Sequence, residues 1–196
     1  AAYISKYYRS LHVANLSTAV MQPFEFKESA NPHDTANGKI QRNGKNVYTF
    51  LDNGAPYTIV IGAHYDHLGK GNHGNSLDPN PVGKIHNGAD DNASGTAGVM
   101  ELARYYATNG IKENCNFLFI HFSAEESGLI GSKYFSNHPS IDLNTVQCMI
   151  NMDMIGRLND STHSLMVHGV GTSPAFVNLV QAVPHNGMKL TLDSSG

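Results

Sequence analysis

Acidic side chains gather in the segment 86–95, whose sequence is His-Asn-Gly-Ala-Asp-Asp-Asn-Ala-Ser-Gly. Asp90 and Asp91 are adjacent there, among small neighbours, and an amphipathic helical pattern follows at once. One acidic residue would be enough to cap that helix, whereas two adjacent carboxylates repel each other unless a positive group lies nearby. The segment is therefore compatible with ordinary helix capping and also with a metal site.

Three further groups of possible ligands each follow a segment that is typical of a strand. They are His64 with Asp66, Glu125 with Glu126, and Asp153. His64 and Asp66 are two residues apart, so they face the same side of an extended chain. Ligand sites in open α/β sheets lie outside the carboxyl ends of the strands, so these groups and the 90–91 pair are expected to meet at one edge.

So much negative charge at one edge of a sheet would be costly without compensation, and divalent cations are its natural partners. Carboxylate together with histidine is the ligand set expected for zinc, with manganese or cobalt as alternatives. A phosphate group is excluded as the main ligand, because an anion would not bind among these acids and the chain has no glycine-rich phosphate loop.

Each group also has a purely structural explanation. A histidine at the end of a strand is commonly a hydrogen-bonded core or surface residue, and the Glu125–Glu126 pair is typical of the acidic first turn of a helix. Asp153 is compatible with a turn cap. Each explanation suffices alone, but their coincidence at the same end of successive strands favours a metal site.

The elements that must position these groups alternate between helix and strand. We predict helices over 1–12, 97–106 (with a stop at Asn109-Gly110), 129–137 and 173–183, and strands over 21–28, 47–51, 57–61, 116–122, 146–152, 164–168 and 189–192. The strands at 116–122 and 146–152 are apolar enough to be buried on both faces, while 47–51 and 57–61 flank a turn and predict a hairpin. This order indicates an α/β fold of three layers, with a mostly parallel mixed sheet and helices on both faces.

Length and composition restrict the possibilities further. A chain of 196 residues with 40% hydrophobic and 15% charged residues suits a single globular domain over 1–196. The net charge of −3 gives no reason to expect nucleic acid or an anionic membrane as a partner, and no apolar run is long enough to span a bilayer.

The chain starts at Ala1 without Met or a signal-like segment, so we expect a processed or cut N-terminus. Cys115 and Cys148 are too few for a disulfide scaffold or a cysteine zinc site and are expected to be buried thiols.

Four motifs, in this order, resemble those of the co-catalytic zinc aminopeptidases of the M28 peptidase family. They are Gly-Ala-His-Tyr-Asp-His at 62–67, Gly-Ala-Asp-Asp-Asn-Ala-Ser-Gly at 88–95, Ala-Glu-Glu-Ser-Gly-Leu-Ile-Gly-Ser at 124–132 and Asn-Met-Asp-Met at 151–154. The resemblance implies the zinc-exopeptidase fold, in which His64, Asp90 and Asp153 bind one zinc ion. Asp90 would bridge to a second zinc ion, which Glu126 also binds, and the peptide bond between Asp90 and Asp91 would be cis.

The same resemblance implies roles for the other two acids and for the substrate. Glu125 would be the general base that takes a proton from the attacking water, and Asp66 would orient His64. The substrates would be peptide or protein N-termini, held by carboxylates beside the metal ions, which favours exopeptidase over endopeptidase action. Family members of this kind are typically secreted or periplasmic, and the sequence does not indicate which N-terminal residue is preferred.

One part of the family pattern is missing. The last ligand of the second zinc ion is a histidine from a loop near the C-terminal end, and this chain stops at Gly196, short of such a loop. His163, His168 and His185 do not match the loop motif. We therefore expect a catalytic domain that is incomplete at its C-terminal end, with a second zinc site that is weak or empty.

Two other functions remain open at this point. Glutaminyl cyclases are aminoacyltransferases on a related fold that use a single zinc ion, and the intact 88–95 motif argues against them. A non-catalytic binding relative would have kept the fold and lost ligands or the general base, whereas this chain keeps both motif acids at 125 and 126.

Overall fold

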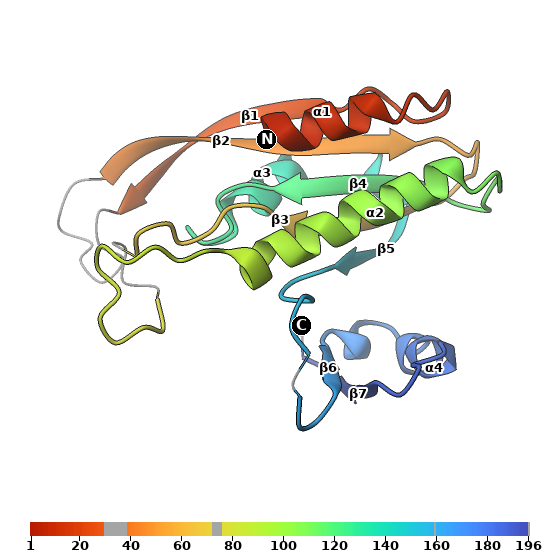
Figure 1. Ribbon diagram of the computed structural model, residues 1–196. Helices are drawn as coiled ribbons and strands as arrows, with labels where there is room; N and C mark the ends of the chain where they lie inside the picture. The colour runs from red at the N-terminus through yellow and green to blue at the C-terminus, as the bar shows by residue number, and fades with distance from the viewer. Residues whose placement is uncertain (30–38, 72–75, 159, 196) are drawn as a thin grey trace. The chain divides into compact units, whose positions relative to one another are not determined.

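The computed structural model describes residues 1–29, 39–71, 76–158 and 160–195. It contains two compact units, Ala1–Met154 and Ile155–Gly196 (Figure 1). All the candidate site residues lie in the first unit, and the expectation of one domain over 1–196 stays a prediction. Among the described residues, no helix is both long enough and apolar enough to cross a membrane.

The first unit is built on a five-stranded mixed sheet with the strand order β1-β2-β4-β3-β5. The strands are β1 (Val20–Ser29), β2 (Lys39–Leu51), β3 (Thr58–His64), β4 (Asn116–Phe122) and β5 (Val146–Asn151). β3 runs parallel to both of its neighbours, β4 and β5, whereas β2 is antiparallel to β1 and β4. The carboxyl ends of β3, β4 and β5 therefore meet at one edge of the sheet, as the sequence predicted.

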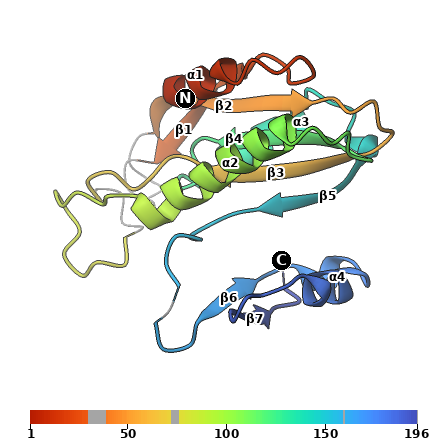
Figure 2. The same cartoon turned by 45° about the vertical axis from the view of Figure 1, so that its right-hand side comes forward.

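Helices cover both faces of this sheet and give the predicted three layers (Figures 1 and 2). α1 (Ala2–Ser10) and α2 (Gly95–Thr108) pack on one face, where their apolar side chains join a core that includes Phe117 and Phe119. α3 (Ile130–Asn137) packs on the other face through Phe135, against a second core that includes Leu118 and Ile120. Alternate residues of β4 thus point to opposite cores, which is why its sequence is apolar without a break.

The predicted hairpin between 47–51 and 57–61 is wrong, because β4 lies between β2 and β3. β2 instead pairs antiparallel with β1 and extends back to Lys39, well before the predicted start at 47; residues 30–38 lie outside the described residues. The turn after β2 is tied to the start of β4, since Asn53 N donates to Asn116 Oδ1 at 2.9 Å and Asn53 Nδ2 donates to the Cys115 carbonyl at 2.8 Å. β4 is buried on both faces and lies at the centre of the sheet, so β2 and β3 cannot pair with each other.

β5 differs from its prediction as well. It was expected to be buried on both faces, yet Met149 is 46% exposed and Ile150 is 51% exposed. The reason is its place in the sheet, because within the described residues β5 pairs with β3 alone and forms an edge. Cys115 and Cys148 are free thiols that are half-buried rather than buried, and burial raises the pKa of both.

The second unit holds a small two-stranded parallel sheet of β6 (Ser164–Val167) and β7 (Lys189–Leu192). Between these strands lie a 3₁₀ turn, Val170–Thr172, and α4 (Phe176–Ala182), so the predicted helix begins three residues later than its Ser-Pro signal suggested. His168 lies beside β7, with Nδ1 3.0 Å from Asp193 Oδ2. This hydrogen bond gives His168 a local structural role within its own unit.

Candidate metal centre

His64 ends β3, and its side chain is only 3% exposed. Thr96, in the first turn of α2, donates its hydroxyl hydrogen to the His64 carbonyl at 2.8 Å and fixes the backbone there. The ring nitrogen Nδ1 faces the Asp66 carbonyl oxygen at 3.1 Å and the Asp66 Oδ1 atom at 3.8 Å. Both neighbours are oxygen acceptors, so a ring that uses Nε2 to bind a metal ion can keep its proton on Nδ1.

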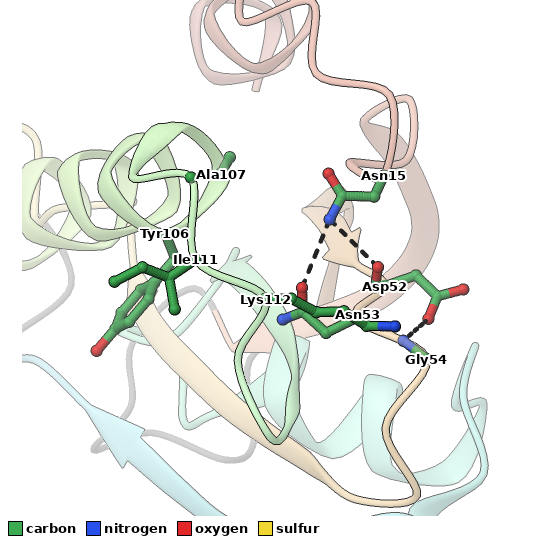
Figure 3. Close-up of a pocket in the computed structure, with 9 residues that line it drawn as sticks. Asn15, Asp52, Asn53, Gly54, Tyr106, Ala107, Ile111 and Lys112 are labelled. Carbon is green, nitrogen blue, oxygen red and sulfur yellow. Dashed lines mark hydrogen bonds between the residues drawn. The ribbon is translucent and has the colours of Figure 1, made fainter.

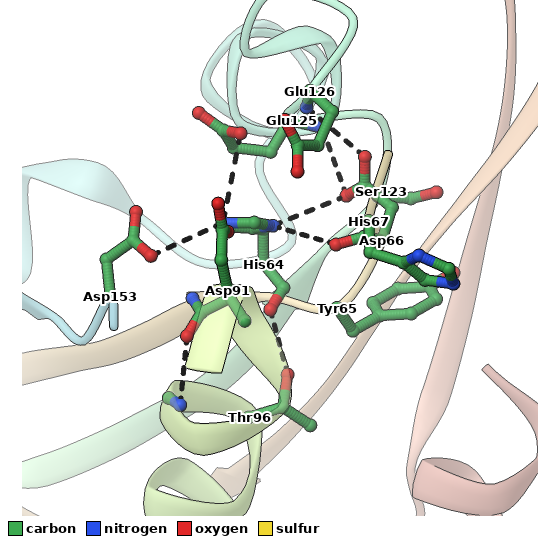
Figure 4. A network of polar contacts seen from close by, with 12 residues as sticks. His64, Tyr65, Asp66, His67, Asp91, Thr96, Ser123, Glu125, Glu126 and Asp153 are labelled. Atoms are coloured by element: carbon green, nitrogen blue, oxygen red, sulfur yellow. Dashed lines mark hydrogen bonds and ion pairs between the residues drawn. The ribbon is translucent and has the colours of Figure 1, made fainter. Parts of the chain in front are cut away.

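Three carboxylates converge on that Nε2 atom (Figure 4). Asp91 Oδ1 lies 3.2 Å away, Asp153 Oδ1 3.5 Å and Glu125 Oε2 3.8 Å. Ligand atoms of His64, Asp91 and Asp153 all lie within 4.8 Å of one another. A lone pair surrounded by carboxylates is repulsive unless a cation lies among them, and one imidazole with carboxylate oxygens is a donor set that fits a divalent metal ion.

Asp91, and not Asp90, is the acid of the central pair that faces His64. The structure thus places Asp91, and not the expected Asp90, beside His64, and it places the cis peptide bond between Asp91 and Asn92, one residue later than expected. Asp90 instead takes part in the turn before α2, where the Ser94 hydroxyl donates to the Asp90 carbonyl at 2.6 Å. The carboxylate of this pair that lies against His64 Nε2 is thus that of Asp91.

Asp66 has a second role that the sequence did not reveal. Its carboxylate accepts the backbone N–H of Glu125 at 3.1 Å, through Oδ1, and that of Glu126 at 3.2 Å, through Oδ2. Asp66 therefore contacts His64 mainly through its backbone and uses its side chain to hold the turn that carries both glutamates. The same turn is held from β1, since the Ser127 hydroxyl donates to Glu28 Oε1 at 2.6 Å.

Burial and the neighbouring carboxylates raise the pKa values of Glu125 and Glu126. Burial raises the pKa of Glu125, and the charges of Asp66, Asp153 and Asp91 raise it further, whereas His64 lowers it. Burial likewise raises the pKa of Glu126 to about 7, with the Asp91 and Glu125 charges adding to the effect. Without a cation the site thus favours bound protons, and a divalent ion among these oxygens would restore the charged forms.

Comparison with known proteins agrees with this geometry. The model of peptidase family M28 matches residues 46–191, which include every residue of the cluster. The chain belongs to peptidase family M28. Within the M28 match, the site groups come from the ends of β3, β4 and β5 and from the turn before α2.

Curated M28-type relatives are considerably longer than this chain. Leucine aminopeptidase 2 of Trichophyton rubrum is 34% identical over 131 residues, which are 63% of this chain and 24% of that enzyme. The matched segment thus spans about a quarter of that relative's length.

Solved structures show the fold of this M28 chain. The glutaminyl cyclase of Porphyromonas gingivalis superposes with a TM-score of 0.70 at 21% identity, over 92% of this chain and 59% of that one. A Zn-dependent exopeptidase of Parabacteroides distasonis superposes with a TM-score of 0.64 at 19% identity, over the same shares. The two neighbours carry different activities in their names, so the shared fold does not choose between them.

A cavity of about 480 Å³ lies at the end of the sheet opposite to the carboxylate cluster around His64. Figure 3 shows the residues that line it. Its lining includes Asn15, Asp52, Asn53 and Lys112, from the turn after β2 and the segment after α2. Asp52 Oδ1 accepts the Gly54 N–H at 2.8 Å, and the Asn15 amide donates to the Asp52 carbonyl at 3.3 Å. Asn15, Asp52 and Asn53 are thus engaged in hydrogen bonds with the turn and with neighbouring segments, unlike the carboxylates that converge on His64.

The raised pKa of Glu126 predicts how the metal-free M28 protein responds to pH. The folded-state pKa of about 7 lies above the ordinary value of 4.5, so the folded protein binds the proton more tightly than the unfolded chain. The stabilisation from this group is fully present below about pH 4.5 and is lost as pH rises through about 7. In EDTA, the melting temperature of the unmodified protein should therefore fall between pH 5 and pH 8 relative to that of Glu126→Gln.

The glutamine variant is the matched reference, because it keeps the shape of the side chain and removes only its titration. Melting curves in EDTA at several pH values measure the difference, which should shrink when a divalent metal ion is added at pH 8 to the unmodified protein. Parallel pH profiles for the two metal-free proteins would contradict the prediction.

Proposed function

We propose that this protein is a zinc-dependent aminopeptidase that hydrolyses the N-terminal peptide bond of its substrates. The observation that carries this proposal is the convergence of Asp91, Asp153 and Glu125 on the Nε2 atom of His64. Membership of peptidase family M28 and the similarity to leucine aminopeptidase 2 support the same activity. The name of the solved Zn-dependent exopeptidase supports zinc as the metal.

His64, Asp91 and Asp153 would hold one zinc ion, and Asp91 with Glu126 would supply ligands to a second. A zinc ion so held supplies Lewis acidity, polarising a carbonyl group and lowering the pKa of water. We infer two ions in a complete site. Asp91 and Glu126 are the two ligands proposed for the second ion, so we expect it to bind more weakly than the first.

Glu125 performs the proton transfers in this proposal. Its carboxylate takes a proton from the water that attacks the scissile carbonyl carbon, and it then gives that proton to the leaving amine nitrogen. The turn held by Asp66 fixes the Glu125 backbone, and the carboxylate lies 3.8 Å from His64 Nε2, beside the proposed metal position. Glu126, the next residue, diverges from it, so the two acids can divide the roles of base and ligand.

Peptides with a free N-terminus are the proposed substrates. The N-terminal ammonium group of such a peptide is attracted to carboxylates beside the metal ions, and an acetylated N-terminus loses that attraction. This favours cleavage at the chain end over cleavage within it. Secretion or a periplasmic location, which the family resemblance suggested, stays a proposal.

Glutaminyl cyclase activity is the competing function, since one neighbour by fold carries that name. The relative at 34% identity is an aminopeptidase, which favours hydrolysis. We expect the full-length, zinc-loaded protein to cleave an aminoacyl chromogenic amide and not its N-acetylated form, with activity lost in EDTA and restored by zinc. Conversion of an N-terminal glutamine peptide to its cyclic product, without amide hydrolysis, would overturn the aminopeptidase proposal.

A further inference from the structure

Asn92, the residue after Asp91, has no role in the proposed chemistry, yet it is one of the most deeply buried polar residues, at 1% exposed. Its side chain leaves the turn before α2 and reaches the segment that follows β5. Asn92 Nδ2 donates to the Met152 carbonyl at 2.9 Å, and Asn92 Oδ1 accepts the Met154 N–H at 3.3 Å. Oδ1 also accepts the Gly95 N–H at 2.9 Å, which ties the side chain to the start of α2.

The backbone groups that bond to the Asn92 side chain flank Asp153 in the sequence. Met152 precedes it and Met154 follows it, so one carboxamide holds the backbone on both sides of a proposed metal ligand. Because Asn92 is itself bonded to Asp91 through the main chain, it connects two of the acids that converge on His64. The Met152 N–H further donates to the Gly62 carbonyl at 2.8 Å, which joins the same segment to the strand that ends in His64.

Gly95 shows how closely the two segments must approach. A Cβ atom at this position would overlap the Met152 carbonyl oxygen and the Asn92 Oδ1 atom. A backbone oxygen cannot move aside as a flexible side chain can, so a residue without a side chain is needed here. The close approach of Gly95 to Met152 and the three hydrogen bonds of Asn92 therefore hold the same two segments together.

We infer that Asn92 is a positioning residue that sets the separation between Asp91 and Asp153 and thereby the affinity and geometry of the metal centre. The inference rests on the proposed metal centre, and it adds a residue that the metal does not touch. Partners that orient metal ligands from outside typically contribute about 10- to 100-fold to metal affinity. A comparable loss is expected when the Asn92 side chain is removed.

The chain offers a matched control in Asn116, at the opposite end of the sheet. Asn116 is also buried, at 8% exposed, and it makes the same kinds of bonds. Its Oδ1 accepts the N–H groups of Asn53 and Ala55, at 2.9 and 3.2 Å, and its Nδ2 donates to the Ala55 carbonyl at 2.8 Å. Truncating either asparagine removes one donated and two accepted hydrogen bonds, but only Asn92 lies beside the proposed ligands.

The test compares Asn92→Ala and Asn116→Ala in the full-length protein, prepared metal-free. Calorimetric titration with Co²⁺ gives the affinity, the visible absorption of bound Co²⁺ reports the ligand geometry, and thermal unfolding in EDTA gives the stability. We expect both variants to lose stability, and Asn92→Ala alone to bind Co²⁺ about 10- to 100-fold more weakly with an altered spectrum. Equal Co²⁺ affinities and spectra in the two variants would overturn the inference.

Asn92→Asp covers the case in which the alanine variant does not fold. It keeps the shape and both accepted bonds but places a carboxylate oxygen against the Met152 carbonyl, so an altered Co²⁺ spectrum is expected. The spectrum is the readout here, because the added negative charge would attract any cation; an unchanged spectrum would overturn the inference. If the unmodified protein binds no Co²⁺ or Zn²⁺, the metal centre itself fails, an outcome distinct from failure of the Asn92 role alone.

Discussion

Replacing Glu125 by glutamine in the full-length, zinc-loaded protein is expected to lower kcat by about 10²- to 10⁴-fold, the usual contribution of a positioned general base. Glutamine keeps the size of the side chain and the backbone N–H that Asp66 accepts at 3.1 Å, so the turn should keep its conformation. What is lost is the ability to take a proton from water and return it to the leaving amine. Zinc content should stay close to that of the unmodified protein, because the proposed ligands are unchanged.

Steady-state hydrolysis of an aminoacyl chromogenic amide, with zinc content measured on the same samples, checks this expectation. Glu101→Gln is a suitable control, since Glu101 is an exposed α2 residue paired with Arg104. It removes the same charge at a distance from the cluster and should leave kcat within about twofold. Hydrolysis by Glu125→Gln at the rate of the unmodified protein would show that Glu125 is not the general base.

The positions of the site residues along the fold were predictable, because two sequence patterns coincide. Apolar runs end at 122 and near 151, and potential ligands follow both of them and also the strand that carries His64. Parallel pairing of β3 with β4 and β5 brings such strand ends together, and this pairing is confirmed. Sequence periodicity could therefore place His64, Glu125 and Asp153 at one edge without any knowledge of distances.

The choice between Asp90 and Asp91 was not predictable, because it depends on backbone dihedral angles within one short turn. Asp91 has φ −104° and ψ 92°, and Asn92 has φ −137° and ψ 48°, values that are not helical although the segment leads directly into α2. Neither residue type requires such angles, so counting along the motif cannot show which carboxylate turns inward. The acid beside His64 and the cis bond each lie one residue later than the sequence suggested.

Contacts between distant segments account for the other differences. The hairpin prediction failed because β4, which lies more than fifty residues further along the chain, enters between β2 and β3. Two further contacts join residues about sixty positions apart: Asp66 accepts the Glu125 N–H, and Asn92 donates to the Met152 carbonyl beside Asp153. Local patterns carry no information about such pairs, although they determine how well the site is held.

The second large effect is expected from neutralising Asp91. Asp91→Asn should weaken the binding of divalent metal ions by more than about 100-fold, beyond the usual loss for a residue that only orients a ligand. Activity at micromolar zinc should fall to less than about 1% of that of the unmodified protein, because Asp91 lies nearest to His64 Nε2, at 3.2 Å, and is proposed to serve both ions. Zinc titration and amide hydrolysis measure the two effects.

Asp90→Asn is the matched control, because it removes the same charge one residue away and so reproduces most of the long-range electrostatic change. Its carbonyl can still accept the Ser94 hydroxyl, which preserves the turn before α2. Metal affinity and kcat should both stay within about threefold of the unmodified protein, a difference typical of charges outside direct contact. If Asp90→Asn instead abolished metal binding while Asp91→Asn retained it, the bridging role would return to Asp90, and the turn in solution would have to present the other side chain to His64.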